Sequence, residues 1–277
     1  MRGERPSAPM PRTLTIAGSD SGGGAGIQAD IKTFTAFGTF AMTAVTAVTA
    51  QNTLGVVRAR ALPSTMVSAQ IAAVRDDLGV DATKIGMLAT PAIVRAVTRA
   101  VRAGGLGPVV LDPVLASTSG QALLDPTGVA ALGDLLPLVD VCTPNVPEAA
   151  VLLGCAEGEL AAPEARRQAC AALRRLGPAH VVLKGGHVRQ AEEAVDIWYD
   201  GDGWRELRAP WVRTRHTHGT GCSFSAAVTA GLALGRALDD ALTDAKAFVA
   251  WGIAHAPGLG AGAGPIQHIG WPGRSGA

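Results

Sequence analysis

Hydrophobic positions along the chain alternate between short apolar runs and longer amphipathic segments almost throughout. Short runs rich in Val, Ile and Leu are typical of buried strands, whereas apolar residues three and four positions apart are typical of helices. The predicted strands are 14–17, 41–50, 56–62, 84–87, 108–111, 139–143 and 180–184, with a hairpin of 194–199 and 204–208. The predicted helices are about 27–34, 64–78 with Ser64 as N-cap, 91–103, 127–135, 147 onward, 163–176, 223–234 and 238–256. This order predicts an α/β fold with a mainly parallel sheet and helices on both faces.

Composition narrows the function classes. The chain has 277 residues, with 24 Lys plus Arg against 23 Asp plus Glu, so its formal net charge is +1 and gives no signature of nucleic-acid or anionic-membrane binding. The uncharged stretch 33–57 has too many threonines for a membrane span. Four cysteines without C-x-x-C spacing indicate reduced thiols in a cytoplasmic protein. We expect a single domain over 12–270, with tails at 1–11 and 271–277.

Polar and glycine clusters fall where the predicted strands end. In open parallel sheets, ligands bind outside the carboxyl ends of the strands. The clusters are 18–26, 51–52, 112–113, 145–148, 184–187 and 218–222. The first contains G-x-G-x-x-A, but no acidic residue lies at 32–74 to hold a ribose, and the chain has no P-loop motif. The clusters therefore predict a site at one sheet edge that uses neither dinucleotide nor P-loop chemistry.

The segment His218-Gly219-Thr220-Gly221-Cys222 is the most informative cluster, because it precedes a predicted helix. Converging main-chain N–H groups and the positive end of a helix dipole bind phosphate or a developing anion. The same field predicts a Cys222 thiol pKa lowered toward neutrality, which suits a proton acceptor or a nucleophile. The competing interpretation is a small buried residue at a helix start. His218, four residues earlier, is a candidate partner of Cys222.

Five other residues have both a functional and a structural interpretation. Asp112 and Glu148 could hold a hydrated Mg²⁺, although Glu148 could equally complement a helix dipole beside Asn145. Lys184 could neutralise a polyphosphate or be a surface lysine. Asp30 interrupts an apolar neighbourhood, and a buried carboxylate needs a partner, either a ligand atom or a capped backbone.

Several blocks resemble, in the same order, the hydroxymethylpyrimidine/phosphomethylpyrimidine kinases of thiamine biosynthesis. The matching blocks are 15–20, 22–30, 49–53, 84–88, 111–114, 143–148, 184–187 and 218–222. The resemblance covers about 13–268 and implies a ribokinase-like, three-layer α/β/α sandwich. It also implies ATP-dependent phosphorylation of 4-amino-5-hydroxymethyl-2-methylpyrimidine to its monophosphate and then to the diphosphate, with Mg²⁺, in a homodimer.

The same resemblance assigns roles to individual residues. Gln51 is expected to bind the aminopyrimidine edge, since an amide offers both a donor and an acceptor. The ring is expected to lie among Gly18, Ala25, Asp30, Met87 and Val114. ATP is expected at Asn145, Lys184 and Gly221, and the metal at Asp112 and Glu148. Cys222 stands where many ribokinase-like enzymes have an Asp base, with Gly219, Thr220 and Gly221 holding the phosphoryl group. A loose transition state needs only a weak base that takes the proton late.

Three alternatives stay open on the sequence. A pyridoxal/pyridoxine kinase of the same fold shares 218–222, and Gln51 is the residue that argues against it. A cysteine-dependent hydrolase could use Cys222 with His218, but it leaves the 145–148 cluster and Lys184 without a use. A non-enzymatic binding protein for thiamine precursors would show no ATP turnover.

Overall fold

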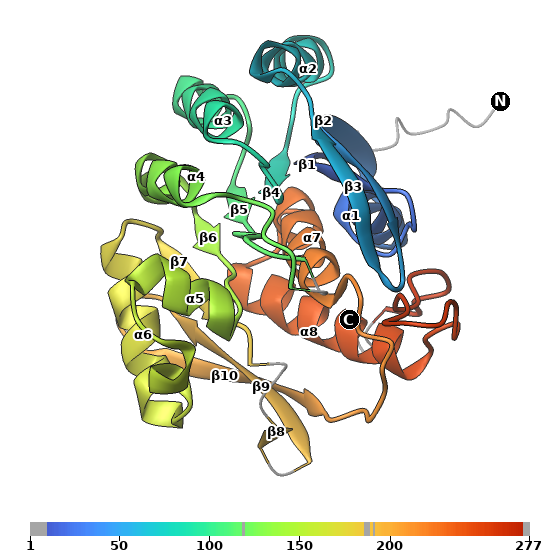
Figure 1. Cartoon of the computed structure of the whole chain (residues 1–277), viewed down its shortest axis with the longest axis vertical. Helices are drawn as coiled ribbons and strands as arrows, with labels where there is room; N and C mark the ends of the chain where they lie inside the picture. The colour runs from blue at the N-terminus through green and yellow to red at the C-terminus, as the bar shows by residue number, and fades with distance from the viewer. Residues whose placement is uncertain (1–9, 118–119, 186–188, 191, 274–277) are drawn as a thin grey trace, which may run out of the picture.

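One large mixed sheet organises the chain (Figure 1). The computed structural model describes residues 10–117, 120–185, 189–190 and 192–273. Its strands are β1 (Arg12–Asp20), β2 (Phe40–Asn52), β3 (Gly55–Ala61), β4 (Ala82–Ile85), β5 (Val109–Leu111), β6 (Val141–Cys142), β7 (His180–Leu183), β8 (Arg189–Gln190), β9 (Glu193–Tyr199) and β10 (Trp204–Pro210). The strand order is β10-β9-β7-β6-β5-β4-β1-β2-β3, and β8 pairs with β9. The pairs from β2 through β1, β4, β5 and β6 to β7 are parallel, whereas β3, β8, β9 and β10 join antiparallel. The predicted mainly parallel sheet is confirmed.

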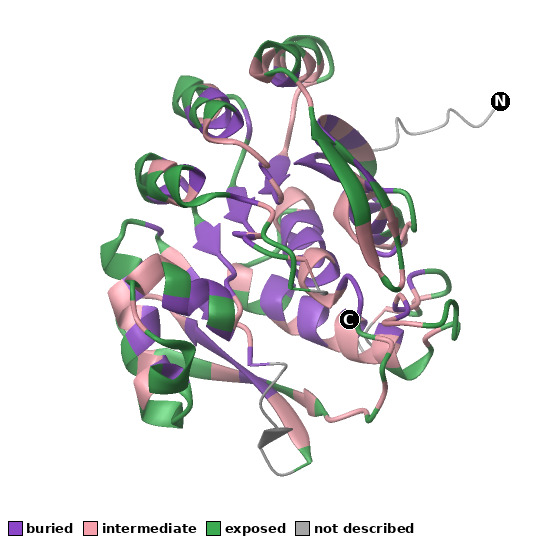
Figure 2. Cartoon of the chain, in the orientation of Figure 1, coloured by how far each residue is buried: buried purple, intermediate pink, exposed green. Residues whose placement is uncertain are grey.

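Helices cover both faces of this sheet. They are α1 (Gly26–Ala36), α2 (Ser64–Asp77), α3 (Pro91–Ala103), α4 (Pro126–Ala131), α5 (Val146–Leu153), α6 (Pro163–Arg175), α7 (Thr220–Ala233) and α8 (Leu238–Ala254). Val109 and Leu111 of β5 pack in the core beneath α2, α3 and α4, while Val110 between them packs beneath α7 and α8. This alternation is what a strand buried on both sides requires. The three-layer α/β/α architecture is confirmed, with the strands buried between exposed outer helix faces (Figure 2).

Element ends agree with the sequence in some places and differ in others. Thr90 caps α3 by accepting a hydrogen bond from the Ile93 N–H, as its position before a proline predicts. Ser64 does not cap α2: it is the first helical residue, and Pro63 takes the cap position without a side-chain bond. β1 continues past the predicted end at residue 17 as far as Asp20.

The start of α7 has a functional consequence. Gly219 adopts a left-handed φ of 81° and its carbonyl already accepts the N–H of Ser223 at 2.8 Å. The helix therefore begins at Thr220, three residues before the predicted Ser223, and Cys222 lies within its first turn.

Residues near the two ends of the described range differ in how they pack. The ring of Trp271 packs edge-to-face against Phe248 and Trp251 of α8. Met10, near the other end, is 59% exposed. No helix among the described residues is long and apolar enough to cross a membrane.

Candidate active site

Two glycine loops meet at the carboxyl end of β1. A Cβ at Gly219 would lie 1.8 Å from the carbonyl oxygen of Gly24, so only glycine fits this contact. Gly26, the first residue of α1, has a φ of 57°, and a Cβ there would lie 2.3 Å from the carbonyl oxygen of Gly18. Because no side chains separate the loops, the first turn of α7 sits directly against the β1–α1 turn. The first N–H groups of a helix have no intrahelical acceptor, so this turn can bind an anion.

A lysine and a carboxylate lie beside this helix start. Lys184, which follows β7, donates from Nζ to Asp112 Oδ1 at 2.6 Å, and both side chains are largely buried. A Cβ on Gly221 would lie 3.0 Å from Lys184 Nζ and 3.7 Å from Asp112 Oδ2. Burial lowers the pKa of Lys184, but the neighbouring Asp112 and Glu148 carboxylates raise it above its ordinary value. A charged ammonium and a helix N-terminus therefore converge on one point, as phosphate binding requires.

Asn145 and Glu148 form a capping box at the start of α5. Asn145 Oδ1 accepts the Glu148 N–H at 2.8 Å, and Glu148 Oε2 accepts the Asn145 N–H at 2.8 Å. Burial, with the Asp112 charge adding to it, raises the Glu148 pKa to about 7 against the opposing effect of Lys184. Asn145 and Glu148 thus have the structural role of capping α5, and Glu148 also lies close enough to the Asp112 carboxylate to be affected by its charge.

Those two carboxylates suit a hydrated Mg²⁺. Such an ion takes one or two carboxylates and completes its shell with water and phosphate oxygens. Repulsion from Asp112 contributes to the raised Glu148 pKa, and a divalent cation would relieve that repulsion. Within the described residues, no group of three or more His, Cys, Asp or Glu side chains forms a complete protein cage for a metal.

Cys222 differs from its sequence-based prediction. Burial raises the pKa of its thiol to about 11, and the carboxylates of Asp112 and Asp30 add to the effect. The Lys84 ammonium and the Gly26 N–H lower this pKa, but not enough to reverse the shift. The expected thiol pKa near neutrality is therefore wrong for the ligand-free protein, because the half-buried thiol is desolvated and lies near the Asp112 and Asp30 carboxylates.

Beneath the glycine loops lies a buried ion pair. Lys84 Nζ donates to Asp30 at 3.0 Å and 2.9 Å from its two carboxylate oxygens, and Thr15 Oγ1 donates to the same carboxylate at 2.6 Å. The three side chains have no exposed surface. The partner of Asp30 is thus a lysine, neither of the two alternatives expected, and Asp30 cannot touch a ligand directly in this conformation. Sequence reasoning missed Lys84, although it begins one of the matching blocks.

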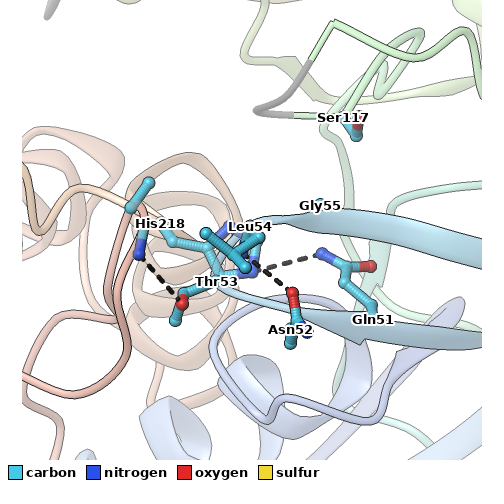
Figure 3. Close-up of a pocket in the computed structure, with 9 residues that line it drawn as sticks. Gln51, Asn52, Thr53, Leu54, Gly55, Ser117 and His218 are labelled. Atoms are coloured by element: carbon cyan, nitrogen blue, oxygen red, sulfur yellow. Dashed lines mark hydrogen bonds between the residues drawn. The ribbon is translucent and has the colours of Figure 1, made fainter.

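A pocket of about 230 Å³ opens between the β2–β3 turn and the α7 loop (Figure 3). Its lining residues are Gln51, Asn52, Thr53, Leu54, Gly55, Ser117, His218, Gly262 and Ala263. Of the residues expected around the pyrimidine, Gln51 lines this pocket. Gly18 and Met87 contact each other, since a Cβ on Gly18 would lie 2.9 Å from Met87 Sδ. Val114 borders a smaller apolar hollow with Leu88 and does not reach the main pocket.

His218 pairs with Asp20 instead of Cys222. Its Nε2 lies 2.9 Å from Asp20 Oδ2, so the predicted His218–Cys222 partnership is wrong. Asp20 also accepts the N–H groups of Gly22 and Ala25 at 2.8 Å and 2.9 Å. Burial raises the pKa of Asp20, but the hydrogen bonds from His218 and the loop lower it below its ordinary value. The signal that sequence reasoning passed over is an acidic residue that only Ser21 separates from a glycine run.

The structure brings most of the remaining predicted residues to this edge. The Ala25 main chain belongs to the Asp20 loop, and Thr220 heads α7 with Gly221. Gly186 and His187 of the matching block 184–187 lie outside the described residues.

Comparison with known proteins places these features in a family. The family model for phosphomethylpyrimidine kinase matches residues 20–267. Hydroxymethylpyrimidine/phosphomethylpyrimidine kinases from Rhizobium meliloti and Bacillus subtilis are 48% and 43% identical, covering 92% and 93% of this chain and 96% and 94% of their own lengths.

Solved structures agree with this placement. A Bacillus subtilis pyridoxal kinase in complex with ADP has a TM-score of 0.86 at 39% identity, covering 94% of this chain and 97% of its own. A phosphomethylpyrimidine kinase from Clostridium difficile has a TM-score of 0.75 at 38% identity, covering 86% and 97%. The family resemblance of the sequence blocks is thereby confirmed, and the chain belongs to the phosphomethylpyrimidine kinase family.

Proposed function

We propose that this chain transfers the γ-phosphoryl group of ATP to 4-amino-5-hydroxymethyl-2-methylpyrimidine, and then a second one to the resulting monophosphate, in thiamine biosynthesis. One observation carries the proposal: the first turn of α7 faces Lys184 and Asp112, with only hydrogen at Gly221 between them. Relatives that are 43–48% identical bear the names of these two activities.

The transferring phosphoryl group has a natural position in this geometry. In a loose transition state, positioning and charge stabilisation do most of the work. We assign the holding of that group to the main-chain N–H groups of Gly219, Thr220, Gly221 and Cys222, with Lys184 neutralising its charge. Asn145 lies beside Lys184 through a parallel bridge and completes the ATP side. Mg²⁺ held by Asp112 and Glu148 would neutralise the polyphosphate when bound.

Cys222 is assigned as the late proton acceptor. Its thiol is protonated in the ligand-free protein, and the Lys84 ammonium and the Gly26 N–H favour the minor thiolate form that can take the hydroxyl proton. Cys222→Ala should lower kcat by about 100-fold or more with little change in pyrimidine affinity, the range typical of general-base removal. An unchanged kcat contradicts the assignment.

The pyrimidine is assigned to the side of the site that carries Gln51. Its amide lines the pocket and matches an amino group beside a ring nitrogen. Gly18, Ala25, Met87 and Val114, none of which lines that pocket in the ligand-free protein, are assigned to the ring surroundings of the bound pyrimidine. Asp30 acts from beneath, through Lys84, since its carboxylate is wholly buried.

Product analysis tests the function directly. Purified protein with Mg-ATP and the hydroxymethylpyrimidine should give the monophosphate and then the diphosphate by mass spectrometry. Pyridoxal supplied in a parallel reaction tests the second candidate, which the high structural similarity to pyridoxal kinases favours. Phosphorylation of pyridoxal without phosphorylation of the pyrimidine would replace the first function by the second. Absence of any ATP turnover would favour a binding protein.

The assembly belongs to the same proposal. We infer one domain over 12–270, acting as a homodimer in the cytoplasm on small molecules, without nucleic-acid or membrane partners. Apolar side chains stand out along the sheet edge formed by β2 and β3: Val48 is 49%, Leu54 70% and Val57 80% exposed. An edge strand with exposed apolar residues is a natural pairing surface. Light scattering during gel filtration should give a mass near twice 28.1 kDa, and a monomer contradicts the dimer.

A further inference from the structure

A series of hydrogen bonds connects the glycine loop to the pocket. Asp20 Oδ2 lies 2.9 Å from His218 Nε2. That nitrogen lies 3.3 Å from Nε2 of Gln51, and both of these side chains line the pocket of Figure 3. At its other end, the Gln51 amide oxygen lies 3.2 Å from Thr49 Oγ1. Asp20 and His218 are buried, whereas Gln51 reaches the pocket. Gln51, the residue expected to recognise the substrate, is thus contacted at its two amide ends by His218 and Thr49.

Those groups determine which way the Gln51 amide must face. An ionised carboxylate only accepts hydrogen bonds, so His218 Nε2 must carry a hydrogen and donate it to Asp20. That nitrogen therefore has no lone pair to accept a hydrogen bond from Gln51, and its single N–H, directed at Asp20, can only be shared with the Gln51 amide oxygen. The Thr49 hydroxyl donates to the Ser19 carbonyl at 2.9 Å, its shorter contact, and so offers a lone pair to Gln51. Both neighbours favour the amide with its oxygen toward His218 and its nitrogen toward Thr49. The two amide ends have nearly the same shape, so this exchange displaces nothing.

We propose that Asp20 and His218 are positioning residues that set the orientation of the Gln51 amide and thereby select an aminopyrimidine over a ring that lacks the amine. The proposal rests on the function proposed above. With one lone pair of the oxygen on His218 and one N–H on Thr49, a single acceptor and a single donor remain for a ligand. This pair matches an exocyclic amine beside a ring nitrogen. A hydroxymethylpyrimidine with hydrogen in place of that amine leaves the amide oxygen short of a donor, and such sites discriminate strongly.

The histidine ring has little freedom to turn. A Cβ on Gly24 would lie 2.5 Å from His218 Cδ2, and the His218 main-chain N–H donates to the Gly264 carbonyl at 3.0 Å. His218 also begins the segment that continues into Gly219 and the phosphoryl-holding turn of α7. These contacts hold the imidazole in place opposite Gln51.

The test compares two alcohols on matched variants. His218→Phe keeps a ring but removes the donor, whereas His218→Gln restores a donor near the Nε2 position. Thr49→Val, in β2, removes the other contact without touching the α7 loop. His255→Phe, at the exposed end of α8, is the control for replacing a histidine ring. For each variant, kcat/KM is measured with the aminopyrimidine alcohol and with its analogue that has hydrogen in place of the amine, together with KM for Mg-ATP and the dissociation constant of each alcohol without ATP.

The expected result is a change of selectivity. His218→Phe should lower kcat/KM for the aminopyrimidine by roughly 10–100-fold, the effect of leaving a polar group in a site unpaired, and leave the analogue without the amine within about twofold. Thr49→Val should act in the same direction, His218→Gln should recover most of the loss, and the control should match the wild type. KM for Mg-ATP should stay unchanged.

Two results would overturn the inference. Equal losses on both alcohols would mean that His218 only supports the fold, and an effect confined to KM for Mg-ATP would place it on the nucleotide side. If the wild type binds the aminopyrimidine without phosphorylating it, the proposed function fails. The inference is then judged by whether His218→Phe changes the ratio between the dissociation constants of the two alcohols. If the wild type binds neither alcohol, both fail.

Discussion

The thiol of Cys222 should be unusually unreactive in the ligand-free protein. Only the thiolate is a nucleophile, and burial with the Asp112 and Asp30 carboxylates raises this pKa to about 11. At pH 8, such a thiol is ionised in roughly 0.1% of molecules, whereas an ordinary thiol with a pKa of about 8.5 is ionised in about a quarter. We therefore expect alkylation on the order of 200-fold slower than that of an ordinary cysteine.

Pulsed alkylation with iodoacetamide measures this difference. The pulse is applied between pH 7 and pH 10, and mass spectrometry of the proteolytic peptides separates Cys222 from the other three cysteines. Its rate should rise about tenfold for each pH unit across this range without a plateau, because the pKa lies above it. The same protein unfolded in urea is the control, and its Cys222 should titrate like a free thiol.

Lys84→Met provides an internal check on the cause. Its ammonium lowers the Cys222 pKa, so removing it should move the rate profile to still higher pH. A rate that reaches a plateau by pH 8 in the wild type would refute the reasoning. That outcome would mean that the N–H groups and dipole of α7 outweigh burial and the acidic neighbours.

Three further perturbations test other contacts. Lys84→Met leaves the wholly buried Asp30 without its cation and should lower the free energy of unfolding in urea by about 3–5 kcal/mol. Adding Asp30→Leu should recover most of this loss, and a loss below about 1 kcal/mol contradicts a structural ion pair. Gly219→Ala forces a Cβ onto the Gly24 carbonyl and should lower kcat by about 100-fold, the range for losing a main-chain anion site, while the pyrimidine affinity stays near that of the wild type. An unchanged kcat would contradict this prediction. Because the pKa of Asp20 is lowered in the folded protein, its carboxylate stabilises the fold above its unfolded pKa of about 4, and this stability is lost as pH falls through the folded pKa. Asp20→Asn should therefore have a lower free energy of unfolding than the wild type at neutral pH, and the two values should converge at low pH.

The fold could be predicted because its signals are local. A strand covered on both faces is a short apolar run, and such runs at 108–111 and 180–184 correspond to β5 and β7. Helix starts could be predicted where a side chain caps its own helix, as Thr90 does. They could not where the cap depends on tertiary contacts: α7 begins early because Gly219 folds against Gly24, which is nearly two hundred residues away in the chain.

The site could be predicted only in its location. Strand ends in a parallel sheet share one edge, so placing Asp112 and Lys184 together follows from topology. Pairings between distant residues have no such rule. Asp30 meets Lys84 and Asp20 meets His218 because of side-chain directions in the packed core, and spacing in the sequence suggested the wrong partner for His218.

The cations of this site already have anionic partners before any ligand binds. Lys184 is held by Asp112 and Lys84 by Asp30, so the region carries little net positive charge, in keeping with a chain of net charge +1. A lone phosphate would have to compete with Asp112 for Lys184, whereas a nucleotide that arrives with a divalent cation offers Asp112 a new partner as it takes the lysine. Exchange of partners, with no buried charge left unpaired, avoids the penalty that separating an ion pair in a buried site would otherwise impose. Under the proposed function, we therefore expect this arrangement to favour metal-bound triphosphate over free phosphate.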